Sequence, residues 1–498
     1  MSSTARMIGL IAGPLGALLV FLLLPDVYVN DGGDVVPLST AARTAAAVAT
    51  WMAVWWITEA IAVYATALIP LAAFPLTGTE SIKSTAASYG HELIYLFLGG
   101  FILALALERC GLHRRFALMA LRAVGTCPRR IIGVFMGIAA FISMWVTNTA
   151  TTIMLLPVAL SIITLMHDSV GEDDDAPDQN FSICLLLAIA YAATIGGIGT
   201  IIGTAPNVFL VSYIRSQMDI EISFVQWMAF ALPLVVVFLP LAWWLLSRVI
   251  YRVSAEPIPG VSALLEKMHS ELGAPTRAEK LTLIVFLLTA GAWVTRPLLQ
   301  KITVGGVMPF AGLSDPGIAV IAAMVLFVTP VSFSKREFLM DWETAVKLPW
   351  GLLILFGGGL ALAATLDRSG FSAFLGSQAI VLSALPLLVI VIMVTATVIF
   401  LTELTSNTAT TATLIPVLYA VAIGLGINPF LLIMPAGIAA SCAFMLPVAT
   451  PPNAVVFGSG LVSIPQMSRA GFWLNIVAIL LVPLLSWLVI MPALGVFD

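Results

Sequence analysis

The chain has 498 residues, of which 60% are hydrophobic and only 10% are charged, and its mean hydropathy is +1.07. A water-soluble fold of this composition would expose a large apolar surface, so the sequence predicts an all-α polytopic protein embedded in a lipid bilayer. The net charge of −4 says little about partners in so long a chain, but no basic patch typical of a nucleic-acid partner is visible. The four cysteines and four histidines are scattered singly, which argues against a disulfide framework and a zinc site.

Eleven apolar stretches are long enough to cross a hydrocarbon core about 30 Å thick as helices. In chain order they lie near residues 7–24, 41–58, 60–76, 92–107, 181–214, 225–247, 280–297, 317–333, 350–366, 427–458 and 471–495. The first stretch has no small-residue cleavage site behind it, so it is predicted to be a transmembrane helix and not a signal peptide. Paired arginines flank an amphipathic segment at 108–125, which predicts a helix on the membrane surface.

Two further apolar stretches, about 131–166 and 377–424, are long enough to enter the membrane and return. A cluster of Ser, Thr and Asn interrupts each stretch midway. Irregular backbone at membrane depth survives only where it is buried in protein or lines a wet cavity. We therefore expect two re-entrant hairpins whose tips lie inside the protein.

The distribution of basic residues predicts the orientation of the chain. If the amino terminus is cytoplasmic and both hairpins return to their starting side, sixteen of the 22 Lys and Arg residues fall inside. The other six are Arg43, Lys83, Arg215, Arg296, Lys301 and Arg368. This asymmetry obeys the positive-inside rule, and it is lost if either hairpin is treated as a single crossing. The carboxyl terminus is therefore expected to face outward.

The chain contains an internal repeat with a constant offset. Residues 97–111 align with 356–370 at an offset of 259, and the same offset carries Asn148 onto Asn407. The two copies lie in a topology that is predicted to invert between them. An inverted repeat is typical of secondary transporters, whose binding site lies where the two halves meet.

A second pair of motifs, 203–207 and 449–453, matches at an offset of 246. The change of offset corresponds to the acidic segment 167–180, which is predicted to be a solvated loop inserted in one half only. Each half therefore supplies two polar interruptions of apolar helix.

These interruptions can bind ions of both signs. Freed carbonyls, hydroxyls and amide oxygens coordinate a hard monovalent cation, whereas the amino ends of half-helices attract carboxylates. A cation bound beside an anion offsets its charge and couples the two binding events. The alternative, that the polar clusters only join helices by hydrogen bonds, is disfavoured because both clusters occur twice at matched offsets.

Glu403 is an acidic residue predicted to lie within the membrane, which makes it a functional candidate. It could carry protons, or it could bind backbone amides and hydroxyls around the hairpin tip. Because its repeat counterpart at position 144 is Met, the structural role is favoured. Glu59, near a predicted cytoplasmic turn, is also expected to be structural.

With these motifs the chain resembles the divalent anion/sodium symporter family, the bacterial relatives of the di- and tricarboxylate transporters. The resemblance covers about residues 40–498 and rests on the motifs at 147–149 and 406–408 and, most specifically, on 447–460. Thr147 replaces the usual Ser of the family and Ala205 replaces the first Pro of the Pro-Pro-Asn loop. Neither change removes an oxygen ligand.

The resemblance implies a homodimeric elevator-type transporter with about 11 transmembrane helices and two re-entrant hairpins. Its expected divisions are scaffold helices at 1–130, half of a transport domain at 131–224, further scaffold helices at 225–376, the other half of the transport domain at 377–470, and a final transmembrane helix at 471–498. By similarity, sodium would bind Ser143, Asn148, Gly196, Gly199, Thr402, Thr405, Asn407 and Ala449. Substrate carboxylates would meet Asn148, Thr149, Asn407, Thr408, Thr450 and Pro451.

The expected function is sodium-coupled import of a C4-dicarboxylate such as succinate, malate or fumarate across the inner membrane of a bacterium. No Lys or Arg lies in either motif to replace a cation, which favours sodium coupling. Proton coupling or exchange, with citrate, tartrate or sulfate as substrate, is the alternative, and an anion channel is a further one. An intramembrane enzyme is disfavoured because the motifs contain no nucleophile–base pair and no acidic pair in register.

Overall fold

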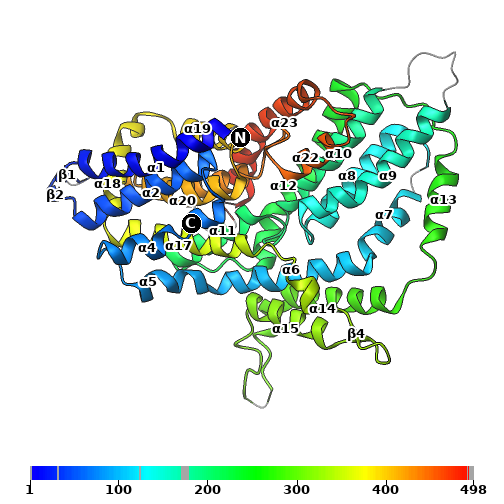
Figure 1. Cartoon of the computed structure of the whole chain (residues 1–498), viewed down its shortest axis with the longest axis horizontal. Coiled ribbons are helices and arrows are strands. Elements are labelled where there is room, and N and C mark those ends of the chain that lie inside the picture. Colours follow the sequence, from blue (N-terminus) through cyan, green and yellow to red (C-terminus); the bar gives the residue numbers. More distant parts are fainter. Residues whose placement is uncertain are drawn as a thin grey trace.

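The computed structural model describes residues 3–30, 33–122, 125–169, 179–304, 306–490 and 492, which form an almost entirely helical molecule (Figure 1). Two antiparallel β-hairpins accompany the helices, β1 (Val27–Val29) with β2 (Val35–Pro37) and β3 (Pro330–Ser332) with β4 (Glu337–Phe338). Within the described residues, nine helices are long and apolar enough to cross a membrane, or ten if one sharply bent pair counts as a single span. The prediction of an all-α polytopic membrane protein is confirmed.

The helices before the first hairpin are α1 (Ser3–Leu23), α2 (Thr40–Thr58), α3 (Val63–Thr66), α4 (Ile69–Leu76), α5 (Ile82–Ala87), η1 (Ser88–Gly90), α6 (Glu92–Cys110) and α7 (Leu112–Arg122). The stretch expected at 60–76 is thus two short helices, with Pro70 near the start of the second. Proline favours the first turn of a helix and has no backbone N–H to donate to a preceding turn, so Pro70 marks the start of a new helix. The amphipathic helix expected at 108–125 is confirmed as α7.

The two hairpins form as helix, break and helix. Their arms are α8 (Pro128–Ser143) with α9 (Asn148–Ser169) and α19 (Leu387–Thr402) with α20 (Asn407–Gly424). The expected start of the second hairpin at 377 is wrong, because α18 (Phe371–Ala379) and η3 (Ile380–Ala384) precede it and are bent by 117° from α19. Pro386 holds Leu385 in an extended conformation with ψ of 145°, so the helix cannot continue through it.

The remaining helices include two broken spans. Each expected break is present, between α10 (Gln179–Gly197) and α11 (Ala205–Met218) and between α21 (Phe430–Ala439) and α22 (Pro451–Phe457). The others are α12 (Phe224–Trp244), η2 (Leu245–Ile250), α13 (Val261–Glu271), α14 (Arg277–Leu299), α15 (Asp315–Val328), α16 (Trp342–Ala345), α17 (Trp350–Arg368), α23 (Ile464–Leu485) and η4 (Ser486–Ile490). The inserted acidic segment predicted to be a solvated loop falls largely on 170–178, outside the described residues.

The hairpins approach the centre of the molecule from opposite ends. Figure 1 shows α7, α8, α9 and α13 gathered at one end and α2, α18 and α20 at the other, with α6 running between them. Helix α8 packs on α10, α18 on α20, and α6 on α15. The contact of α8 with α10 needs glycine, since a Cβ on Gly196 would lie 2.3 Å from the carbonyl oxygen of Ala140. This packing fixes the first hairpin against the first broken span.

Candidate functional site

The tip of the first hairpin brings a hydroxyl and an amide together. Ser143 ends α8 and Asn148 begins α9. The Ser143 hydroxyl can donate to Asn148 Oδ1 at 2.5 Å and to the carbonyl of Ala193 in α10 at 2.6 Å. A Cβ on Gly197 would lie only 2.5 Å from Asn148 Oδ1, so the amide is pressed against the end of α10.

The tip of the second hairpin repeats this arrangement. Thr402 ends α19, and Asn407 begins α20. The Thr402 hydroxyl can donate to Asn407 Oδ1 at 2.7 Å and to the carbonyl of Ala440 at 3.0 Å. Thr402 and Asn407 are the repeat equivalents of the Ser and Asn at the first tip, so the offset found in the sequence carries over to hydrogen-bonding geometry.

Two buried asparagines hold the unwound segments in shape. Asn207 Nδ2 donates to the carbonyls of Gly197 at 3.1 Å and Thr200 at 2.8 Å. Asn453, its equivalent at an offset of 246, donates to the carbonyl of Leu446 at 3.0 Å, and Leu446 is the equivalent of Thr200. Both asparagines lie in the motifs found in the sequence, which gave no indication of this role. An amide two residues into a half-helix that follows a break is the signal that could have identified them.

One cavity of about 810 Å³ is lined by both tips and both breaks. The six residues predicted to meet the substrate all line it: Asn148, Thr149, Asn407, Thr408, Thr450 and Pro451. Glu59, Glu108 and Lys347 are the charged residues that line it within the described part of the chain. The motif cavity, as we call it, is therefore neutral and polar where the four motifs meet, and its charges lie on neighbouring elements.

The residues predicted to bind sodium fall into three groups. Ser143 with Asn148 and Thr402 with Asn407 form the two hydroxyl–amide pairs, whereas Thr405 and Ala449 line the motif cavity. The third group, Gly196 and Gly199, packs against α8 and the Met144 side chain. The glycine beside the Asn148 amide is Gly197, which was not predicted because a run of glycines gives no indication of which one faces the site.

The donor set at the first tip fits a hard monovalent cation. The amide atom of Asn148 that faces Ser143 lies 3.2 Å from the carbonyl oxygen of Ala193 and 3.3 Å from that of Gly203. The Ser143 hydroxyl, the Asn148 amide and the two carbonyl oxygens thus converge within a few ångströms, and no thiolate or imidazole lines the cavity among the described residues. Such oxygen ligands favour hard cations over transition metals.

Glu403 holds the second break against the hairpin tip. Its carboxylate is buried and accepts hydrogen bonds from the backbone amides of Phe444 at 2.7 Å and Leu446 at 3.2 Å, and from Met445. Asn475 Nδ2 of α23 donates to it at 2.8 Å. Four donors around one carboxylate support the structural interpretation over proton transfer. At the equivalent position in the first half, the backbone carbonyl of Met144 accepts from the Thr200 hydroxyl.

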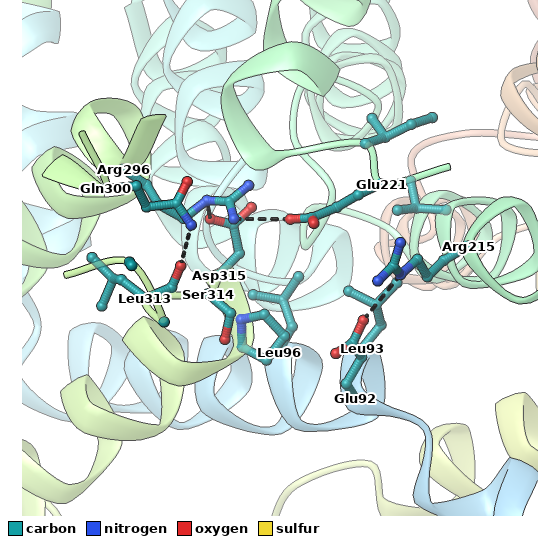
Figure 2. Close-up of a pocket in the computed structure, with 15 residues that line it drawn as sticks. Glu92, Leu93, Leu96, Arg215, Glu221, Arg296, Gln300, Leu313, Ser314 and Asp315 are labelled. Atoms are coloured by element: carbon teal, nitrogen blue, oxygen red, sulfur yellow. Dashed lines mark hydrogen bonds and ion pairs between the residues drawn. The ribbon is translucent and has the colours of Figure 1, made fainter. Parts of the chain in front are cut away.

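A separate cluster of charged residues joins elements away from the motifs. Figure 2 shows a cavity of about 190 Å³ where Arg296 pairs with Asp315 and with Glu221, both at 2.8 Å. Asp315 also accepts from the backbone amide of Phe224 at the start of α12. Because Arg296 and Asp315 are both buried and paired with each other, this cluster ties α12 to α14 and α15.

Comparisons with a family model and with curated proteins agree on the family to which the chain is similar. A family model described as the sodium:sulfate symporter transmembrane region matches residues 16–493. The sodium-dependent dicarboxylate transporter SdcS of Staphylococcus saprophyticus is 41% identical over 498 residues, covering 99% of this chain and 93% of that protein. The transporter of the same name from Staphylococcus aureus strain MRSA252 is 40% identical, with the same coverage of both chains.

Two solved structures share the fold. The YdaH transporter of Alcanivorax borkumensis superposes with a TM-score of 0.61 over 96% of this chain and 97% of that one, at 13% identity. MtrF of Neisseria gonorrhoeae gives a TM-score of 0.62 over 96% of this chain and 94% of that one, at 12% identity. At such low identity the likeness concerns the fold alone.

Proposed function

The chain belongs to the sodium:sulfate symporter family, and from this premise we propose that it is a sodium-coupled secondary active symporter that imports C4-dicarboxylates such as succinate, malate and fumarate. The family and the relatives are transporters, so the chain is not an enzyme. The observation that carries the proposal is the single cavity where two equivalent hydroxyl–amide pairs and both helix breaks meet. The names of the relatives, which specify sodium and dicarboxylates, support both halves of the coupling.

Each tip would hold one sodium ion. At the first tip the ligands would be Ser143, Asn148 and nearby carbonyl oxygens, including that of Ala193. At the second tip Thr402 and Asn407 would play the same parts. The amide carbonyl of each asparagine would face the ion and its NH₂ group the substrate, so that one residue couples the two binding events.

The substrate would be held between two helix amino ends. Helix α9 begins at Asn148 and α20 at Asn407, and both residues line the motif cavity with the threonine that follows each of them. A helix amino end attracts a carboxylate through its free backbone amides. Two such ends facing one cavity suit a molecule with two carboxylates better than a single tetrahedral anion such as sulfate.

Alternating exposure of this cavity would follow an elevator motion. We assign 131–224 and 377–470 to the moving body, 1–130 and 225–376 to a scaffold through which two chains form a homodimer, and 471–498 to a final span. Helix α12 packs against α8, α10 and α23 and is also tied to α14 and α15, so in this division it forms the boundary between the two bodies. The chain would lie in a bacterial plasma membrane with a cytoplasmic amino terminus and an outward carboxyl terminus, as the distribution of basic residues indicates.

The decisive experiment is uptake of radiolabelled succinate into proteoliposomes. We expect accumulation above equilibrium with an inward sodium gradient and none with an equal potassium or proton gradient. Accumulation driven by protons or by internal dicarboxylate would instead indicate proton coupling or exchange. If succinate only reached equal concentrations on both sides of the membrane, whichever ion gradient was applied, the protein would be a channel. Unlabelled citrate, tartrate and sulfate, added as competitors, test the choice of substrate.

The inserted acidic segment is predicted to be dispensable for transport. Deletion of residues 171–178 is expected to leave sodium-driven uptake within about twofold of wild type, because solvated insertions tolerate change. The segment has no counterpart in the second half, which reaches the same tip geometry without it. Initial uptake rates normalised to protein in the vesicles measure this. A transporter inactivated by the deletion would contradict the interpretation of the segment as a loop.

A further inference from the structure

A second polar cavity, of about 430 Å³, lies apart from the motifs. The residues that line it are Ser84, Ala87, Ser88, His91, Ser216, Gln217, Leu360, Ala364, Asp367 and Arg368. They come from α5 and the segment before α6, from the end of α11, and from α17. No residue of the two hairpin tips or the two breaks lines it. We call it the distal cavity.

One wall of the distal cavity is the repeat counterpart of one wall of the motif cavity. Three residues of α17 that line it, Leu360, Ala364 and Asp367, lie 259 positions after three residues of α6 that line the motif cavity. Those α6 residues are Phe101, Leu105 and Glu108. The correspondence extends beyond the helices, since Ser88 in the distal cavity is the equivalent of Lys347 in the motif cavity.

Two equivalent aromatic rings contact each other close to both cavities. Phe97 lines the motif cavity, and its repeat equivalent Phe356 lies one turn before Leu360 of the distal cavity. The two rings contact each other edge to face with centroids 5.2 Å apart, and both are fully buried. Phe209 of α11 packs behind them, 6.5 Å from Phe356. The contact joins residues related by the repeat, one of which lines the motif cavity while the other lies one turn from the wall of the distal cavity.

From this arrangement we infer that the distal cavity is a vestibule through which dicarboxylate and sodium reach the motifs from the side of the membrane opposite to the mouth of the motif cavity. The inference rests on the proposed function and extends it to a route. Helix α11, which supplies Ser216 and Gln217, belongs to the moving body, whereas α17 belongs to the scaffold. Movement of α11 past the Phe97–Phe356 pair would connect the distal cavity to the motifs and disconnect the other mouth.

The first test compares two repeat-equivalent positions on the two cavities. Ser88→Cys and Lys347→Cys are made separately in a chain whose four native cysteines are replaced by alanine. A membrane-impermeant maleimide is then applied to right-side-out and to inverted vesicles. We expect each cysteine to react from one side only, and the two from opposite sides. Reaction of both cysteines from the same side would overturn the inference, and this result does not depend on the identity of the substrate.

The second test fills the distal cavity. Ala364→Trp is expected to lower sodium-driven succinate uptake at least about tenfold while leaving succinate binding by the detergent-solubilised protein within about twofold, because the bulk obstructs a route and not the binding site. Ala364→Ser is the control, and Ala364→Leu replaces the tryptophan if that variant does not fold. Full uptake by the filled variants would overturn the inference. If the wild-type protein neither binds nor transports succinate, the proposed function fails and the thiol labelling still decides the vestibule.

Discussion

Replacing either Asn148 or Asn407 with alanine is expected to reduce sodium-driven uptake at least about 100-fold while the protein stays folded. Each amide would supply an oxygen to a cation and a donor to a carboxylate, and hydrogen bonds to charged groups contribute about 1.5–3 kcal/mol each. Losing two such interactions corresponds to two or more powers of ten in affinity. Initial rates in proteoliposomes, with size-exclusion profiles and thermal unfolding of each variant, measure both parts of the prediction.

The matched control is an amide outside the motif cavity. Gln378 is exposed on α18, and within the described residues its amide donates to the neighbouring Ser377 hydroxyl at 3.2 Å. Gln378→Ala should therefore transport at the wild-type rate. If both asparagine variants also transported at that rate, the assignment of the two tips to sodium and substrate would be wrong.

The hairpins and the cavity residues could be predicted because their signal lies in side chains. Polar residues within an apolar helix are costly, so a polar cluster in an apolar stretch marks an unusual site in the sequence itself. The offset of 259 then matches each residue of the first tip with its equivalent in the second. The same arithmetic relates Ser143 to Thr402, and these two hydroxyls make equivalent contacts. A repeat constrains both copies at once, which is why all six residues predicted to meet the substrate are among those that line the motif cavity.

The backbone carbonyls at the two tips left no such signal. The carbonyls of Ala193 and Ala440 lie within hydrogen-bonding distance of the two tip hydroxyls, yet any residue type presents a carbonyl. The carbonyl of Gly203, which lies 3.3 Å from the Asn148 amide, likewise gives no signal in the sequence. Which carbonyl turns toward a site depends on how a broken helix unwinds, and that is decided by tertiary hydrogen bonds such as those of Asn207.

Helix boundaries were missed where local chemistry outweighs hydropathy. Helix α23 begins at Ile464, seven residues before the predicted 471, because Ser463 and Gln466 form a capping box at its start. A hydropathy window registers the apolar run and not the polar first turn. The second hairpin shows the reverse case, since the apolar residues before Pro386 belong to a separate, sharply bent helix.

Replacing Glu403 with alanine is expected to lower the free energy of unfolding by about 3 kcal/mol or more, since buried donors left without partners cost about 1–3 kcal/mol each. Three backbone amides of the second break and the Asn475 amide donate to this carboxylate. Met144→Ala is the matched control, because the equivalent contact in the first half uses the Met144 backbone carbonyl and survives the substitution. Chemical unfolding in detergent, followed by tryptophan fluorescence, compares the two variants.

The Glu403 experiment also separates the two roles open to this residue. A structural lock predicts that Glu403→Ala loses stability and uptake together, whereas Met144→Ala loses less of both. A proton carrier predicts the opposite pattern for Glu403→Gln, with normal stability and loss of any uptake driven by a proton gradient. Equal stability of Glu403→Ala and Met144→Ala would show that the carboxylate does not hold the break. The four donors that surround it lead us to expect the first pattern, with sodium-driven uptake failing because Ala440 and the rest of the break no longer face the second tip.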